Sequence, residues 1–107
     1  METVRASVMY AGPGKDVLTL FVEPTPSLWV ADPIDDGIAV FRVLDEHGEE
    51  TGEIAGVEII DFLTFDRWED LPDLPMKWQL DGLEPLPLRE LLRKIQQTVR
   101  REKVAAG

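Results

Sequence analysis

The chain has 107 residues, a length that fits one domain. It contains no cysteine, which excludes disulfides, a thiolate nucleophile and a Cys-ligated metal. Its formal net charge of −10 is unevenly spread: residues 1–85 hold 19 acids and 5 bases, whereas residues 86–107 hold 2 acids and 6 bases. The larger part would repel a nucleic acid duplex or an anionic membrane, so only the tail could contact one.

Targeting signals are not evident in the sequence. No stretch approaches the roughly 18 consecutive apolar residues of a membrane span, and the first residues lack the long apolar core of a signal peptide. Together with the missing cysteines, these features predict a cytoplasmic protein without a membrane segment.

Alternating apolar and polar residues predict β-strands through the first part of the chain. Residues 4–10 form a short strand, and residues 16–23 form a strong one that is rich in β-branched and aromatic residues. Residues 28–31 form a weaker strand that ends before Pro33. An Asp-Asp-Gly turn then leads into the strand over residues 38–45.

The longest apolar run covers residues 54–65 and is predicted to form a hairpin with residues 38–45, because a polar loop with two glycines joins them. Asp66 and Glu69 have the spacing of a capping box, which predicts a short helix that the following prolines limit to about one turn. Residues 75–82 predict an additional edge strand.

The tail, residues 86–104, is predicted to be an amphipathic helix, with Pro87 in its first turn. The whole chain, residues 1–107, is therefore predicted to be a single α+β domain that is mainly β over residues 1–85. We expect an antiparallel, meander-type sheet of about 4–6 strands packed against one long C-terminal helix. The apolar stripe of that helix consists of Leu88, Leu91, Leu92, Ile95 and Val99.

Two short patterns lie within residues 8–62. The first has Tyr10, Asp16, Leu18 and Leu20; the second has an acidic turn, Asp45, Glu46 and Gly48, followed by Gly56, Val57, Glu58, Ile59 and Ile60. They resemble a family of small bacterial proteins known as domain of unknown function 2283, whose members typically read Tyr-Asp-x-x-x-Asp-x-Leu-x-Ile and later Gly-Ile-Glu-Ile-Leu.

This sequence departs from the family pattern by one extra residue between Tyr10 and Asp16, by a longer hairpin loop, and by Arg42-Val43 where the family often has an acid. The resemblance implies no established activity. Some proteins of this type lie near small toxin-like genes, so the resemblance implies an antitoxin-like or regulatory role as one expectation.

Glu58 is a carboxylate within an apolar strand, which raises the question of its role. If a glycine bulge in the hairpin loop sets the register, Arg42 lies opposite Glu58 and Val40 lies opposite Ile60. The expected result is a structural ion pair between Arg42 and Glu58. A half-buried general acid or base is the alternative, but the nearby arginine favours the ion pair.

The strand over residues 54–65 is apolar on both sides. One helix covers only one face of a small sheet, so sheet curvature or a second subunit must cover the other face. This pattern predicts a homo-oligomer, with a two-fold dimer favoured.

Other candidate chemistry is weak. His47, the only histidine, lies in an acidic loop that lacks the spacing of a calcium loop, and Asp32 has neighbours typical of a turn. No hydrolase triad is visible, and no catalytic residue, metal or cofactor is predicted. The tryptophans are expected to be core or interface anchors. Carboxylates at the hairpin ends remain weak ligand candidates: Asp35, Asp36 and Asp45.

The most favoured function is a non-enzymatic, oligomeric protein-interaction module. Binding of a small molecule or cation by the hairpin-end carboxylates is one alternative, and nucleic acid regulation through the basic face of the tail helix is another. The residues expected to contact a partner are Leu88, Leu92, Ile95, Arg89, Arg93 and Arg100.

Overall fold

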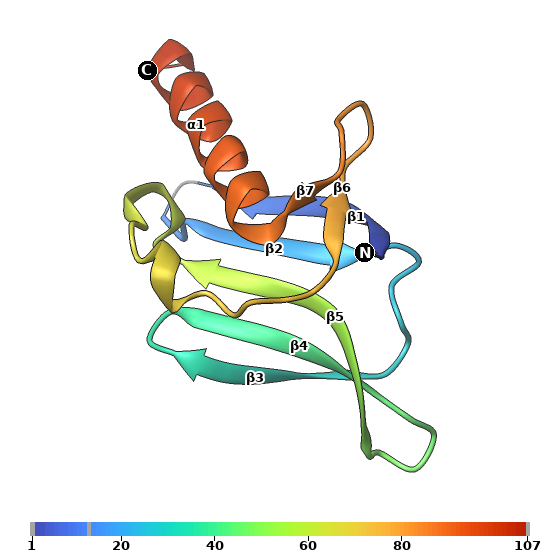
Figure 1. Ribbon diagram of the computed structural model, residues 1–107. Helices are drawn as coiled ribbons and strands as arrows, with labels where there is room; N and C mark the ends of the chain where they lie inside the picture. The colour runs from blue at the N-terminus through green and yellow to red at the C-terminus, as the bar shows by residue number, and fades with distance from the viewer. Residues whose placement is uncertain (1, 13, 107) are drawn as a thin grey trace.

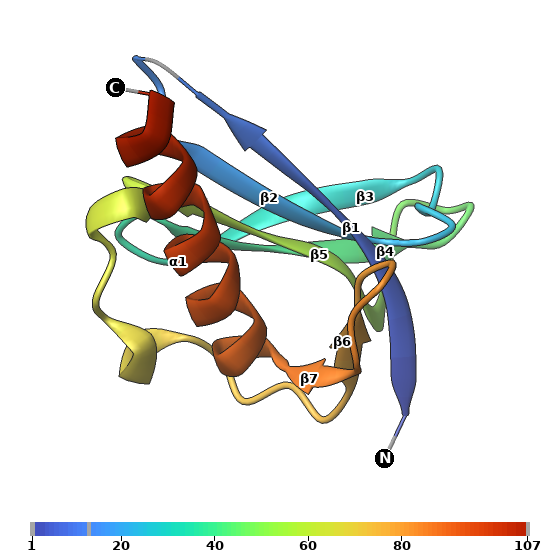
Figure 2. The same ribbon diagram turned by 90° about the horizontal axis from the view of Figure 1, so that it is seen from above.

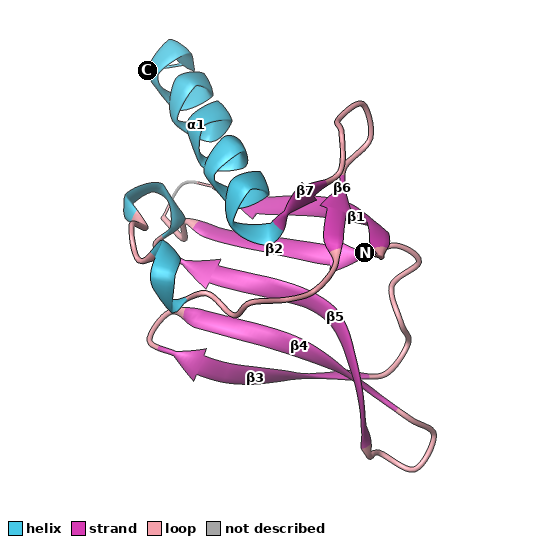
Figure 3. Cartoon of the chain, viewed as in Figure 1, coloured by secondary structure: helices cyan, strands magenta, loops and turns pink. Residues whose placement is uncertain are grey.

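A computed structural model describes residues 2–12 and 14–106 of the chain. Within these ranges, seven strands form one sheet and a single α-helix, α1, packs on it (Figures 1 and 3). The predicted α+β class is confirmed, whereas the sheet has more strands than expected and is mixed. The elements are β1 (Thr3–Ala11), β2 (Val17–Val22), β3 (Trp29–Asp35), β4 (Ile38–Leu44), β5 (Glu50–Ile60), η1 (Phe62–Thr64), η2 (Trp68–Asp70), β6 (Lys77–Gln79), β7 (Leu86–Pro87) and α1 (Leu88–Ala106).

The strand order, β3-β4-β5-β2-β1-β6-β7, is not a simple meander. The β3–β4–β5 meander joins the β1–β2 hairpin through antiparallel pairing of β5 with β2. At the other side, β1 pairs in parallel with β6, where Val4 lies opposite Trp78. The expected edge strand is therefore an interior strand, because β7 pairs with β6 on its far side.

The longest strand, β5, begins and ends earlier than predicted. It ends at Ile60 because Asp61 adopts a left-handed backbone conformation, with φ of 56°, and the chain then turns into η1. The Asp16 carboxylate accepts the backbone N–H of Leu63 at 3.2 Å and the Tyr10 hydroxyl at 2.7 Å. These contacts hold the β1–β2 turn against the start of η1.

The hydrophobic core lies between the sheet and α1. Leu91 and Leu92 are fully buried against it, as are Leu18 and Ile59 from the sheet. The predicted helix and its apolar stripe are therefore confirmed, and the stripe faces the protein's own sheet. Of the helices in the described ranges, none has the length and apolar character needed to cross a membrane.

The predicted capping box at Asp66 is wrong. The 3-10 turn η2 follows Arg67, and no side chain caps its start. Instead, Arg89 of α1 donates to the carbonyl oxygens of Trp68 and Leu71 at 2.7 and 2.8 Å. The turn is thus fixed by a contact with the helix rather than by a local hydrogen bond.

Candidate functional site

The strand register separates the sheet into a covered face and an uncovered face. Residues paired across neighbouring strands point to the same side, and the row Leu18, Ile59 and Ile38 is buried under α1. The alternate rows point away from α1, and Figure 2 shows the helix on one side of the sheet only. We call this uncovered side the open face; it consists of Ser7, Met9, Ala11, Val17, Thr19, Phe21, Trp29, Ala31, Pro33, Ala39, Phe41, Val43, Gly56, Glu58 and Ile60.

An aromatic cluster lies on the open face. The ring centroids of Phe21 and Phe41 are 5.3 Å apart, and those of Trp29 and Phe41 are 4.5 Å apart. Gly56 lies between the two phenylalanines in the same row of the sheet. A Cβ at Gly56 would collide with the Leu20 carbonyl oxygen and would lie 3.0 Å from the Phe41 ring, so only glycine fits beneath the rings.

Several apolar side chains of the open face are in contact with solvent. Met9 is 63% exposed, Ile60 is 46% exposed and Trp29 is 37% exposed, while Val17 and Phe21 are half-buried. These residues come from β1, β2, β3 and β5, so the apolar surface extends across the sheet. An apolar surface that crosses several strands is a common feature of interaction sites.

The predicted ion pair between Arg42 and Glu58 does not form. Glu58 lies opposite Ala39 rather than Arg42, and a register shift after Phe41 places Arg42 opposite Ile54. Arg42 therefore lies on the covered side, where its Nε donates to Asp32 at 2.7 Å. The expected register is wrong because it requires a bulge in the loop that joins β4 to β5. The irregularities lie instead within the paired strands, after Phe41 and after Arg42.

The predicted interaction residues of α1 are used within the molecule. Leu88, Leu92 and Ile95 are buried in the core. Arg89 contacts η2 as described above, the Arg93 guanidinium lies 5.2 Å from the centre of the Trp68 ring, and Arg100 donates to the Leu63 carbonyl oxygen. An amphipathic stripe with flanking arginines has the same pattern whether it binds its own sheet or a partner, so the sequence could not separate the two.

The hairpin-end carboxylates do not come together. Asp35 and Asp36 lie at the β3–β4 turn, whereas Asp45 follows the other end of β4. Asp45 accepts the backbone N–H groups of His47 and Glu49 at 2.8 and 3.0 Å, which is a turn-forming role. Among the described residues, no group of three or more acids, histidines or cysteines is arranged to hold a metal.

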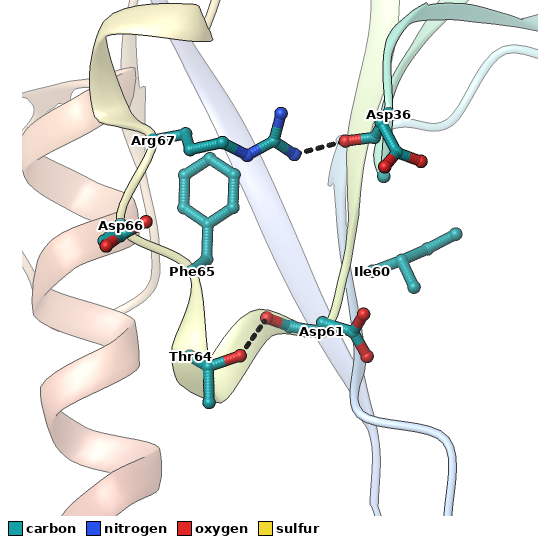
Figure 4. A pocket seen from close by; sticks show the side chains of 8 residues that line it. Asp36, Ile60, Asp61, Thr64, Phe65, Asp66 and Arg67 are labelled. Carbon is teal, nitrogen blue, oxygen red and sulfur yellow. Dashed lines mark hydrogen bonds between the residues drawn. The ribbon is translucent and has the colours of Figure 1, made fainter.

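A hollow of about 230 Å³ lies beside the open face, between the β3–β4 turn and the segment that follows β5 (Figure 4). Arg67 reaches across it to the Asp36 carbonyl oxygen, and its guanidinium lies 5.7 Å from the centre of the Phe65 ring. Ile60 belongs both to this hollow and to the open face. The lining carries three exposed carboxylates, from Asp36, Asp61 and Asp66.

No family model, curated protein or solved structure matches the chain. The resemblance to domain of unknown function 2283 therefore stays a prediction. The physical character of the open face is the best guide to function that the molecule offers.

Proposed function

We propose that this protein is a non-enzymatic interaction module that binds a protein partner on its open face. The observation that carries the proposal is the apolar surface of the half-buried Phe21 and the exposed Trp29, which pack against the buried Phe41, with Met9 and Ile60 exposed on the same face. Aromatic and methionine side chains are enriched at the centres of protein interfaces, where they contribute large contact areas. An antitoxin-like or regulatory role is one form that such a module would take.

The other candidate surfaces support the proposal less well. The arginines of α1 form contacts with their own chain, which leaves less basic surface for a nucleic acid. The carboxylates of Asp36 and Asp45 lie at opposite ends of β4 and do not converge on one ligand. The open face is different because several of its apolar side chains are exposed and point away from the core.

The proposal can be tested by capture from native lysate with matched variants. We expect Met9→Ser/Ile60→Thr to lose a stoichiometric partner that the wild-type protein retains, as measured by quantitative mass spectrometry. Val8→Ser/Val30→Thr is the control, because these side chains are 42% and 41% exposed and lie on the other side of β1 and β3. Partners that bind the open-face variant and the wild-type protein equally would contradict the proposal.

Self-association through the open face is the alternative occupant, in keeping with the homodimer that the sequence predicts. Two copies would pack their sheets face to face, as in a β-sandwich. Light scattering at several protein concentrations distinguishes this arrangement, since a dimer would show twice the monomer mass and Ile60→Asp would dissociate it.

A largely apolar hollow of about 290 Å³ between β1, the β6–β7 turn and α1 is a structural candidate for ligand binding. Leu18, Leu83 and Val99 line it, with Lys94 on its rim. If small apolar molecules bind there, they should raise the melting temperature, and Thr98→Trp, which fills the hollow, should abolish that rise.

A further inference from the structure

Glu58 is an isolated charge near the middle of the open face. It projects from β5, between Thr19 of β2 and Ala39 of β4, and is half-buried. In the described part of the chain it takes part in no ion pair and no side-chain hydrogen bond, although neighbouring carboxylates such as Asp32 do. Its charge is therefore satisfied by solvent as long as the open face is uncovered.

The border of the open face carries further negative charge. Asp61 follows Ile60 directly and is exposed beside the hollow of Figure 4. On the other side, the Glu23 carboxylate accepts the Ser7 hydroxyl at 2.6 Å. Two bases lie near this border, and both are paired: Arg5 with Asp81 at 3.1 Å, and Arg67 with Asp35 and Asp70 at 3.7 and 3.6 Å. Negative charge therefore lies both near the middle of the open face, at Glu58, and at its two ends.

A partner that covers this surface has to satisfy the Glu58 carboxylate, and a positive charge does so most directly. If a neutral apolar surface covered Glu58, the carboxylate would lose its water and gain no partner, which is strongly unfavourable. A second copy of the chain would make the same problem worse, because a two-fold interface uses the same patch twice and would bury two Glu58 carboxylates. The net charge of −10 on each copy adds long-range repulsion.

We propose that the open face binds a cationic amphipathic helix of another protein, with a Lys or Arg of that helix paired to Glu58. This inference rests on the function proposed above and names the chemistry of the partner. Sheet faces are covered by helices or by other sheets, and α1 lies on the opposite side of this sheet. Five strands at about 4.8 Å spacing span roughly 19 Å, which matches about 13 helical residues.

Selection of displayed peptides tests this inference directly. A library of helix-forming peptides is selected on the wild-type protein after depletion on Met9→Ser/Ile60→Thr. The recovered peptides should carry Lys or Arg within their apolar stripe and should lose at least about ten-fold in affinity for Glu58→Gln. Replacing that peptide cation with Glu should restore binding to Glu58→Lys, which shows that both variants are folded and that the two charges meet.

The control is Glu46→Gln, which removes an equal charge in the β4–β5 loop, where the carboxylate is exposed. It should change affinity by less than about two-fold if the effect is local.

Peptides that require the open face but bind Glu58→Gln as well as the wild type would overturn this inference and leave the proposed function intact. Failure to recover any peptide that depends on the open face would overturn it as well, and capture from lysate then decides the proposed function separately. A dimer that Ile60→Asp dissociates would assign the face to a second copy.

Discussion

Tyr10, the only tyrosine of the chain, is a built-in probe of the contact between the β1–β2 turn and η1. Burial, and then the hydrogen bond to Asp16 and the charge of that carboxylate, raises the pKa of Tyr10 from 10.0 to about 12. The neutral phenol is therefore favoured in the folded state. Its contribution to stability is fully present below pH 10.0 and is lost as the pH rises toward about 12.

We expect the ultraviolet absorbance of tyrosinate to appear with a midpoint near 12 in the folded protein and near 10.0 after unfolding in urea. In Tyr10→Phe, the free energy of unfolding should lack the decrease that Tyr10 causes as the pH rises from 10.0 to about 12. Asp16→Asn should lower the midpoint in the folded protein, because it removes the negative charge beside the phenol. A midpoint near 10.0 in the folded wild-type protein would contradict the role assigned to Asp16.

Gly56 supports the aromatic cluster in a way that no other residue can. Gly56→Ala should lower the free energy of unfolding by about 1–3 kcal/mol, because the new Cβ meets the Leu20 carbonyl and the Phe41 ring. Gly12→Ala is the control, since a Cβ added there would meet nothing within 4 Å beyond its chain neighbours. Urea unfolding measures both changes, and equal stability of the two variants would be inconsistent with the packing described.

At the scale of elements, Gln96 connects α1 to the segment after β5. Its side-chain amide is buried and donates to the carbonyl oxygens of Phe62 and Phe65 at 2.7 and 2.8 Å. The Phe62 carbonyl oxygen also accepts the backbone N–H of Phe65 at 3.1 Å, so the amide adds a second donor there and extends the hydrogen bonding to Phe65.

Gln96→Leu should cost about 1–3 kcal/mol of unfolding free energy, because the Phe65 carbonyl loses the amide donor and the Phe62 carbonyl keeps only the backbone N–H of Phe65. Gln97→Leu, one position along and exposed, should change stability by less than about 0.5 kcal/mol. Chemical denaturation of the pair provides the comparison. If both substitutions have the same effect, Gln96 is not the link between α1 and η1.

The elements that could be predicted are those with long periodic patterns. The five longer strands and α1 follow from alternation and from a helical stripe, since each pattern extends over many residues. The end of β3 is an exception, because the strand continues through Pro33 to Asp35 and the expected end before Pro33 is wrong. The strands β6 and β7 have three and two residues, too few for a period, and the pairing of Val4 with Trp78 joins distant parts of the sequence. The position of the bulge in β4–β5, and therefore the environment of Glu58, depends on tertiary packing.

The open face could have been predicted in part. The alternation of Thr19 with Phe21, and of Ala39 with Phe41, places two aromatic residues on the face opposite Leu18 and Ile38. The sequence did indicate that β5 has two apolar sides. It could not show which side α1 covers, because both sides carry apolar residues of similar size.

At the scale of the whole molecule, the net charge of −10 should affect how fast a cationic partner arrives. The association rate of a peptide selected on the open face should fall at least about ten-fold between about 0.05 M and about 0.5 M salt. Glu58→Gln should mainly raise the dissociation rate, because it removes one local contact. Stopped-flow measurements separate the two rates, and a salt-independent association rate would be contrary to electrostatic steering.

The two edges of the sheet are protected against pairing with other chains. Pro33 in the edge strand β3 has no N–H to donate, and Asp32 and Asp35 place charges beside it. At the other edge, β7 has only two residues, one of them Pro87. Short, charged or proline-containing edges disfavour strand-to-strand aggregation, which leaves the open face as the more suitable place for contact with another protein.

The parallel pairing of β1 with β6 has a consequence for synthesis on the ribosome. β1 cannot pair with β6 until residues 77–79 have emerged, and the core side of the sheet is not covered until α1 follows. A nascent chain therefore exposes both apolar sides of its sheet at once, and after α1 docks it exposes only one. Chaperones that bind apolar segments would therefore have access to both sides before α1 docks and to the open face alone afterwards.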